Sequence, residues 1–353
     1  MALSACGGSG SSSSESSSSS ESSSETTETA SSSSSEPKEV KFTSKESGLP
    51  TGYAEPEPAK RKLAFLTVVG TNEFMKAVGE AMNAEAEQLG GSVTVFDAKE
   101  DVNTQVTEFQ QALAQGYEGF FVNAADNQAL APLLKQAEEK GVPVIGLDTS
   151  SSATDLEGFT SQVWEQREKQ AYLQVQELAE HVEPGAPIGQ IEFGIPIPVV
   201  KVYSEYERKW APKFGLEIVG TVQTKNDGIT GGQEAMTGLL AKYPEIQGVL
   251  PYNDPNGIGA SSAARAQGKP EFPIVGTNGG TDALSAIESG NLTATVKIDA
   301  VSIGRFATQG LYDAISGEKI DPTVLSGEPV VVTKENVGET ESWQEEIEAI
   351  SGS

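Results

Sequence analysis

Two residue types that carry much of enzyme chemistry are almost missing from this chain of 353 residues. Cys6 is its only cysteine and His181 its only histidine. A single cysteine excludes an intramolecular disulfide, and one histidine without a nearby cysteine excludes the usual Ser-His, Cys-His and histidine-metal constellations. Carboxylate-only catalysis stays open, although no pair of acidic residues stands out. We therefore expect a protein that is not an enzyme and that uses no cofactor and no metal.

Positive charge and long apolar runs are scarce as well. The chain has 24 Lys and Arg against 51 Asp and Glu, which gives a formal net charge of −27. Because binding to nucleic-acid phosphates requires basic patches, we expect no nucleic-acid partner. No stretch of the sequence is long and apolar enough to span a bilayer. The first apolar run is followed by Gly70-Thr71-Asn72-Glu73, which is not the G-x-G-x-x-G turn of a dinucleotide site.

The first 59 residues differ in composition from the rest. Residues 7–36 are almost entirely Ser, Thr, Gly and Glu, so we expect a disordered tether. The preceding Leu3-Ser4-Ala5-Cys6 resembles a bacterial lipobox, where a signal peptidase cleaves before a cysteine that then takes a diacylglycerol. The charged and apolar regions of a signal peptide do not precede it. The alternative is a lone surface cysteine in a disordered tail. We expect a lipid anchor at Cys6 and a tether that holds the protein at the cell membrane.

A strand-helix-strand pattern occurs twice in the remaining sequence. Residues 119–122 and 142–147 are short apolar runs typical of buried parallel strands, and residues 129–140 between them have helical periodicity. Asn123 and Asp148 follow the two strands, and 25 residues separate them. Residues 248–278 repeat the design, with Asn253 and Asn278 at the same spacing. We infer two similar halves.

Strands alternate with helices from Leu63 onward, which predicts an α/β fold with two doubly wound parallel-sheet lobes. Residues 161–182 are expected to form one long helix, and the acidic residues 341–353 a loose tail. Ligands bind at the carboxyl ends of parallel strands, so the polar residues there should line a cleft between the lobes. The alternative is that these residues only cap helices. Aromatic faces suit the C–H side of a sugar, and Phe74 is the nearest candidate, with Trp164 and Trp210 behind it.

These residues resemble the ribose-type periplasmic sugar-binding proteins, the substrate-binding subunits of ABC importers, from Leu63 to Lys334. The matching segments are Asn72-Glu73-Phe74, Asp97-Ala98-Lys99, Ala114-Gln115-Gly116, Asn123, Gly141-Val142-Pro143-Val144, Asp148, Asn253-Asp254 and Gly276-Thr277-Asn278-Gly279. The resemblance implies the periplasmic-binding-protein type I fold with a three-crossover hinge, near 158–161, 298–299 and 325–329. It also implies ligand binding by Asn72, Phe74, Asn123, Asp148, Asn253 and Asn278, to which we add Trp164.

Four positions depart from the pattern of that family. Thr149 stands where an arginine usually follows the cleft aspartate, and Ser204 or Tyr206 stands where the second lobe usually has another. Ile298 replaces the usual glutamine, and Asn278 replaces an aspartate. The cleft thereby loses bidentate donors and a charge, so the identity of the ligand is open.

Taken with the anchor, the resemblance predicts an extracytoplasmic, lipid-anchored solute-binding protein of an ABC importer. We expect a monomer that binds a small neutral sugar or polyol and presents its closed form to the permease. The expected N-terminal lobe comprises residues 60–160 and 299–327, and the C-terminal lobe residues 161–298 and 328–340. One alternative is a protein that presents its closed form to a chemoreceptor or sensor kinase. A transcription regulator would need an N-terminal helix-turn-helix, where the serine-rich segment stands.

Overall fold

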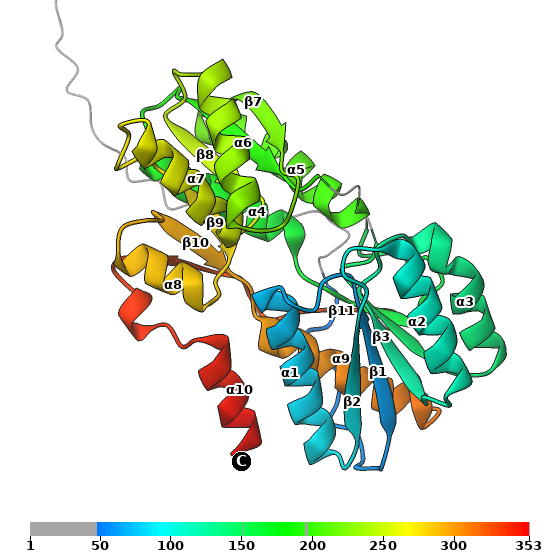
Figure 1. Cartoon of the computed structure of the whole chain (residues 1–353). Coiled ribbons are helices and arrows are strands. Elements are labelled where there is room, and N and C mark those ends of the chain that lie inside the picture. Colours follow the sequence, from blue (N-terminus) through cyan, green and yellow to red (C-terminus); the bar gives the residue numbers. More distant parts are fainter. Residues whose placement is uncertain (1–47, 151, 195–196, 353) are drawn as a thin grey trace, which may run out of the picture. The chain divides into compact units, whose positions relative to one another are not determined.

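The computed structural model describes residues 48–150, 152–194 and 197–352; the predicted lipobox with Cys6 and the serine-rich residues 7–36 lie outside them. Strands and helices alternate along the described chain and gather into two lobes (Figure 1). Each lobe has its own sheet and its own buried apolar side chains. We call the lobe with the first strand the N lobe and the other the C lobe.

The N lobe is built on a six-stranded parallel sheet in the order β11-β5-β4-β3-β1-β2. Its strands are β1 (Lys62–Thr67), β2 (Ser92–Asp97), β3 (Gly119–Val122), β4 (Val144–Leu147), β5 (Ser161–Trp164) and β11 (Thr323–Leu325). Its helices are α1 (Glu73–Gln88), α2 (Val102–Ala114), α3 (Asn127–Glu139) and α9 (Ala300–Ile315).

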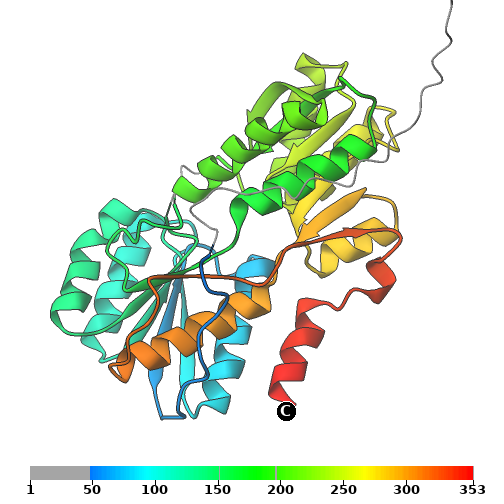
Figure 2. The ribbon, with the colours of Figure 1, turned by 180° about the vertical axis from the view of Figure 1, so that it is seen from behind.

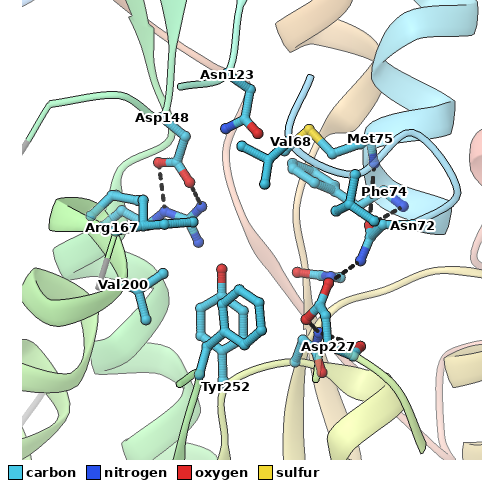
Figure 3. Close-up of a pocket in the computed structure, with 16 residues that line it drawn as sticks. Val68, Asn72, Phe74, Met75, Asn123, Asp148, Arg167, Val200, Asp227 and Tyr252 are labelled. Carbon is cyan, nitrogen blue, oxygen red and sulfur yellow. Dashed lines mark hydrogen bonds and ion pairs between the residues drawn. The ribbon is translucent and has the colours of Figure 1, made fainter. Parts of the chain in front are cut away.

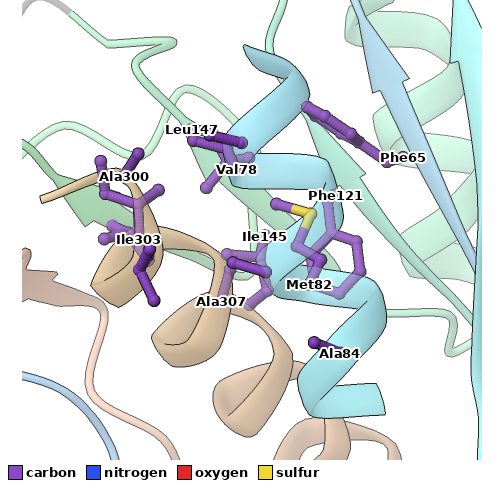
Figure 4. Packing of buried hydrophobic residues seen from close by; sticks show 14 of the residues in the cluster. Phe65, Val78, Met82, Ala84, Phe121, Ile145, Leu147, Ala300, Ile303 and Ala307 are labelled. Carbon is purple, nitrogen blue, oxygen red and sulfur yellow. The ribbon is translucent and has the colours of Figure 1, made fainter. Parts of the chain in front are cut away.

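Adjacent residues of the buried strands point to opposite faces of this sheet, and each face is covered by helices. Phe121 packs with Met82 of α1 and Ala307 of α9 on one face (Figure 4). Its neighbour Phe120 packs with residues of α2 and α3 on the other face. Helices on both faces of a parallel sheet confirm the predicted doubly wound fold.

The C lobe contains two three-stranded sheets, ordered β7-β6-β8 and β12-β10-β9, and a parallel bridge from Val249 to Ile274 joins them. The strands are β6 (Pro187–Glu192), β7 (Glu217–Gln223), β8 (Gly248–Pro251), β9 (Val275–Asn278), β10 (Ala294–Lys297) and β12 (Val330–Thr333). The helices are α4 (Arg167–Glu180), α5 (Pro198–Trp210), α6 (Ile229–Lys242), α7 (Asp254–Ala266) and α8 (Thr281–Glu288), with short 3-10 helices at Ala211–Phe214 and Val337–Glu339. The pairs around β6, and that of β9 with β10, are parallel, whereas β12 runs antiparallel to β10.

The chain crosses between the lobes three times before its last helix. It passes from β5 to α4 through residues 165–166, from β10 to α9 through 298–299, and from β11 to β12 through 326–329. Figure 2 shows the third crossing from behind. The first crossing lies later than the predicted 158–161, because residues 161–164 pair with β4 and β11 as a strand of the N lobe.

Two predictions about secondary structure are wrong. The single helix expected over 161–182 is a strand, β5, followed by a helix, α4, because Gln162 and its neighbours complete the N-lobe sheet. The expected loose tail contains α10 (Trp343–Ser351), which a capping box between Ser342 and Glu345 begins. Trp343 and Ile347 of α10 are buried against the N lobe. Among the described residues, no helix combines the length and hydropathy that crossing a membrane requires.

Candidate ligand-binding site

Asn72 follows β1 and is the first of the predicted site residues. It is the N-cap of α1, where its Oδ1 accepts hydrogen bonds from the main-chain N–H groups of Phe74 (2.9 Å) and Met75 (3.3 Å). Because these bonds commit the oxygen to the helix, the side chain offers the pocket its Nδ2 donors. Capping a helix and serving a binding site are therefore compatible roles for this residue.

Asn253 repeats this arrangement after β8 in the other lobe. Its Oδ1 accepts a hydrogen bond from the main-chain N–H of Asn256 at 2.9 Å and caps α7. Its Nδ2 likewise points away from the helix, toward Asp227. Each lobe thus places an amide donor at a strand end, on a residue that also caps a helix.

Asn123, Asp148 and Asn278 occupy three further strand ends. Asn123 donates from Nδ2 to the main-chain oxygen of Leu147 at 3.2 Å. Asp148 has a left-handed backbone, with φ of 52°, and Asn278 has φ of 124°. Such conformations are uncommon outside glycine and mark positions that their surroundings hold in place.

A single pocket between the lobes brings these residues together (Figure 3). Six of the seven predicted ligand-binding residues line it, all except Trp164. The cavity itself measures about 50 Å³. The full lining is Val68, Val69, Asn72, Phe74, Met75, Asn123, Asp148, Arg167, Phe193, Ile197, Val199, Val200, Asp227, Tyr252, Asn253 and Asn278.

Neither Trp164 nor Trp210, the two tryptophans considered from the sequence, lines this pocket. Trp164 is the last residue of β5, buried in the N lobe, and its main-chain oxygen accepts a hydrogen bond from Ser326 at 2.9 Å. Trp210 ends α5 and packs edge-on against Tyr172, with ring centroids 5.0 Å apart. The aromatic side chains in the lining are Phe74, Phe193 and Tyr252. Phe193 and Tyr252 stack on each other at 5.4 Å with planes 12° apart.

Arg167, the first residue of α4, is the charged group that the sequence did not predict. Its Nε donates to Asp148 at 3.1 Å and its Nη2 makes a second bond to the same carboxylate (Figure 3). Glu165 lies 2.7 Å from the same Nη2, and Gln170 accepts from Nη1 at 3.2 Å. Burial raises the pKa of Glu165 to about 8, although the Arg167 charge opposes this. Burial alone would lower the pKa of Arg167, but the neighbouring Asp148 and Glu165 outweigh this effect and raise the pKa above its usual value.

Asp227, in the loop between β7 and α6, joins the two lobes inside the pocket. Its Oδ2 accepts a hydrogen bond from Nδ2 of Asn72 at 2.7 Å, and its Oδ1 accepts one from Nδ2 of Asn253. Burial raises the pKa of Asp227 to about 7, although both of these hydrogen bonds oppose the shift. Among the described residues no group of three or more Asp, Glu, His or Cys is arranged to hold a metal ion.

The family model for the periplasmic binding protein domain matches residues 63–319 of this chain. The chain belongs to this family. Among curated proteins, the ribose import binding protein RbsB of Bacillus subtilis is 27% identical over 285 residues, which cover 78% of this chain and 90% of the relative. The D-apiose import binding protein of Paraburkholderia graminis is 26% identical, with 83% of this chain and 93% of the relative covered. An ABC transporter periplasmic solute-binding protein from Actinobacillus succinogenes, solved with bound D-allose, superposes with a TM-score of 0.73 at 21% identity, over 79% of this chain and 100% of the other.

In this periplasmic binding protein, an arginine contacts the cleft aspartate although none follows that aspartate in the sequence. Thr149 follows the cleft aspartate, but Arg167 reaches Asp148 from the start of α4. Arg167 lies shortly after the end of β5, so the strand-end rule applies to it as well. The sequence does not reveal this because residues 161–182 favour a single helix, which hides the strand. Asp227 likewise follows β7 by a few residues.

Proposed function

We propose that this periplasmic binding protein is the solute-binding subunit of an ABC importer and binds a small neutral sugar or polyol between its lobes. The observation that carries the proposal is the convergence of strand-end polar side chains from both lobes on one pocket. The names of the ribose and D-apiose import proteins support the same class of function.

The chemistry of the lining suits hydroxyl groups, which donate and accept hydrogen bonds at once. Asn72 and Asn253 offer amide donors, and Asp148 offers carboxylate acceptors. Phe74 and Tyr252 offer aromatic faces for the C–H side of a sugar ring. Because Asp148 offsets the charge of Arg167, the pocket favours a neutral ligand over an anion.

The three crossings between the lobes support closure by a hinge. We propose an N lobe of residues 60–166 and 299–327 and a C lobe of residues 167–298 and 328–340, which rotate as rigid bodies when the ligand binds. The permease would recognise the closed form. We further propose that an acylated Cys6 tethers the protein, as a monomer, to the outer face of the cytoplasmic membrane. We also propose that the protein binds the sugar without converting it.

A thermal-shift screen over pentoses, hexoses, polyols, sugar phosphates and amino acids tests the ligand class. A ligand at 100 times its dissociation constant adds about 2.7 kcal/mol to the free energy of unfolding. We expect a neutral sugar or polyol to raise the melting temperature, and calorimetry to give one site per chain. Stabilisation by sugar phosphates or amino acids alone would contradict the neutral-sugar assignment. Conversion of the bound sugar, followed by NMR, would contradict binding without turnover.

A further inference from the structure

Asp227 uses both of its carboxylate oxygens on amides that face the pocket from opposite lobes. Asn72 of the N lobe donates to Oδ2 at 2.7 Å, and Asn253 of the C lobe donates to Oδ1. Nδ2 of Asn253 also lies 3.4 Å from the main-chain oxygen of Asp227. One side chain therefore occupies an amide donor of each lobe: the bond from Asn72 crosses between the lobes, and the bond from Asn253 lies within the C lobe.

The orientation of the two amides is fixed independently of Asp227. Oδ1 of Asn72 and Oδ1 of Asn253 each accept main-chain hydrogen bonds at the start of a helix. Neither amide can turn over to offer its oxygen without losing its cap, so both present N–H donors to the pocket. A ligand that uses these residues must bring acceptor atoms to them, where the oxygens of Asp227 already lie.

The size of the cavity supports the same conclusion. At about 50 Å³ it is smaller than the roughly 300–1,000 Å³ typical of pockets that take small molecules. A sugar therefore enters only when the lobes separate or a lining side chain moves. Separation of the lobes breaks the bond between Asn72 and Asp227, because these residues belong to different lobes.

We propose that Asp227 is an internal competitor of the ligand: it latches the lobes through Asn72 and occupies the donor of Asn253, and the ligand takes both donors from it with a vicinal pair of hydroxyl oxygens. A carboxylate presents two acceptor oxygens side by side, and a 1,2-diol is the neutral group of a sugar that does the same. This inference rests on the proposed function for the identity of the ligand but not for the latch.

A second contact between the lobes provides a matched control. Glu73 of α1 accepts a hydrogen bond from the main-chain N–H of Thr281, at the start of α8, at 2.8 Å. Removing Glu73 takes away a contact between the lobes but leaves the carboxylate that competes for the two amides. Removing Asp227 takes away both a contact between the lobes and the competitor.

The test compares wild type, Asp227→Asn, Asp227→Ala and Glu73→Ala, with thermal melts to establish that each variant folds. Small-angle scattering without sugar should give radii of gyration that increase from wild type through Asp227→Asn to Asp227→Ala. Only the bond to Asn72 joins the lobes. Alanine removes its acceptor, whereas asparagine keeps one acceptor oxygen that the two amides share, so its radius should lie between the others. An unchanged radius in Asp227→Ala would overturn the latch.

Calorimetry with D-ribose, 2-deoxy-D-ribose and 3-deoxy-D-ribose tests the competition. If two-thirds of the wild-type molecules are latched, Asp227→Ala should bind D-ribose about three-fold more tightly, because affinity scales with the competent fraction. Glu73→Ala should give a smaller gain, since the competing carboxylate of Asp227 stays in place. Weaker or unchanged binding by Asp227→Ala would overturn the competitor role. Each vicinal pair of D-ribopyranose contains the 2- or the 3-hydroxyl, so 2-deoxy-D-ribose or 3-deoxy-D-ribose should bind the wild type about ten-fold more weakly than D-ribose, the factor for a lost hydrogen bond. Equal affinities for all three would overturn the vicinal-diol requirement. If wild type binds none of them, the proposed function fails for this class while scattering still decides the latch.

Discussion

The indole ring of Trp343 packs against the ring of Phe74, with centroids 5.6 Å apart and planes inclined by 58°. Its Nε1 donates a hydrogen bond to the main-chain oxygen of Ile298, at the second crossing between the lobes, at 2.9 Å. A residue of the last helix thus supports both a side chain of the pocket and the hinge.

Replacing Trp343 should therefore affect stability and binding together. We expect Trp343→Ala to lower the free energy of unfolding by about 3–5 kcal/mol, the usual cost of removing a buried tryptophan. Trp343→Phe keeps a ring against Phe74 and loses the bond to Ile298, so its cost should be about 1 kcal/mol. Urea unfolding measures both. Equal losses for the two variants would show that ring packing is not the main contribution.

The buried ion pair between Arg167 and Asp148 should be asymmetric. Arg167→Leu leaves Asp148 and Glu165 without their cation, and breaking a buried pair in this way costs about 3–5 kcal/mol. Asp148→Asn leaves Arg167 beside Glu165, so we expect a smaller loss of stability. Asp148 and Arg167 are both buried. Chemical denaturation of both variants checks the order, and a smaller loss for Arg167→Leu would contradict it.

Glu207 of α5 should make stability fall as pH rises. Burial raises its pKa from 4.5 to about 8, although the hydrogen bond from Gln190 opposes the shift. The folded protein therefore holds a proton that the unfolded chain releases between pH 4.5 and 8, and stability falls across this window. Glu207→Gln should remove a penalty on the order of 5 kcal/mol at pH 8.5 and have little effect at pH 4.5. Exposed Glu205 on the same helix supplies the control, Glu205→Gln. Equal effects of Glu207→Gln at both pH values would contradict the assignment.

Donors from both lobes should contribute to binding of one ligand. Asn123→Ala should weaken binding of the sugar found by screening by about 1 kcal/mol or more. Asn253→Ser keeps an oxygen that can cap α7 and removes the amide donor, so a similar loss would identify the donor rather than the cap. Exposed Asn103→Ala on α2 should leave binding unchanged. If only one of the two pocket variants changes the affinity, the ligand does not bridge the lobes.

Cys6 should determine membrane attachment. When it is expressed behind a bacterial lipoprotein leader, the protein should partition into detergent and carry acyl chains detectable by mass spectrometry, because a diacylglycerol anchors firmly. Cys6→Ser should stay in the aqueous phase. A soluble, unacylated wild-type protein would contradict the lipobox assignment.

Most of the fold could be predicted because its strands are buried on both faces and therefore appear as short apolar runs between periodic helices. Ligands bind at the carboxyl ends of parallel strands, and this rule was enough to predict that the strand-end residues meet in one pocket. These residues are Asn72, Asn123, Asp148, Asn253 and Asn278. The strand β5 was missed because its sequence, Ser-Gln-Val-Trp, is half polar and leads directly into α4. Its buried Gln162 is satisfied by partners distant in sequence, such as Thr323 at 3.1 Å. No local pattern reveals such partners.

The missed helix α10 has a different cause. Its acidic composition concealed an apolar spacing of Trp343, Ile347 and Ile350, which is the stripe of a helix packed on one side. The capping box at Ser342 and Glu345 was also present in the sequence. An acidic composition favours a loose tail, but the residues that decide the structure of this helix are the apolar ones on its buried face, Trp343 and Ile347.

The position of α10 determines what a probe attached near the end of the chain would report. Val337, just before it, is buried in the core of the C lobe, whereas Trp343 and Ile347 are buried in that of the N lobe. A fluorophore at exposed Glu348 would therefore move with the N lobe, and one at exposed Val330 with the C lobe. Two labels close together in the sequence would change their separation when the lobes rotate. This short segment could convert ligand binding into an optical signal.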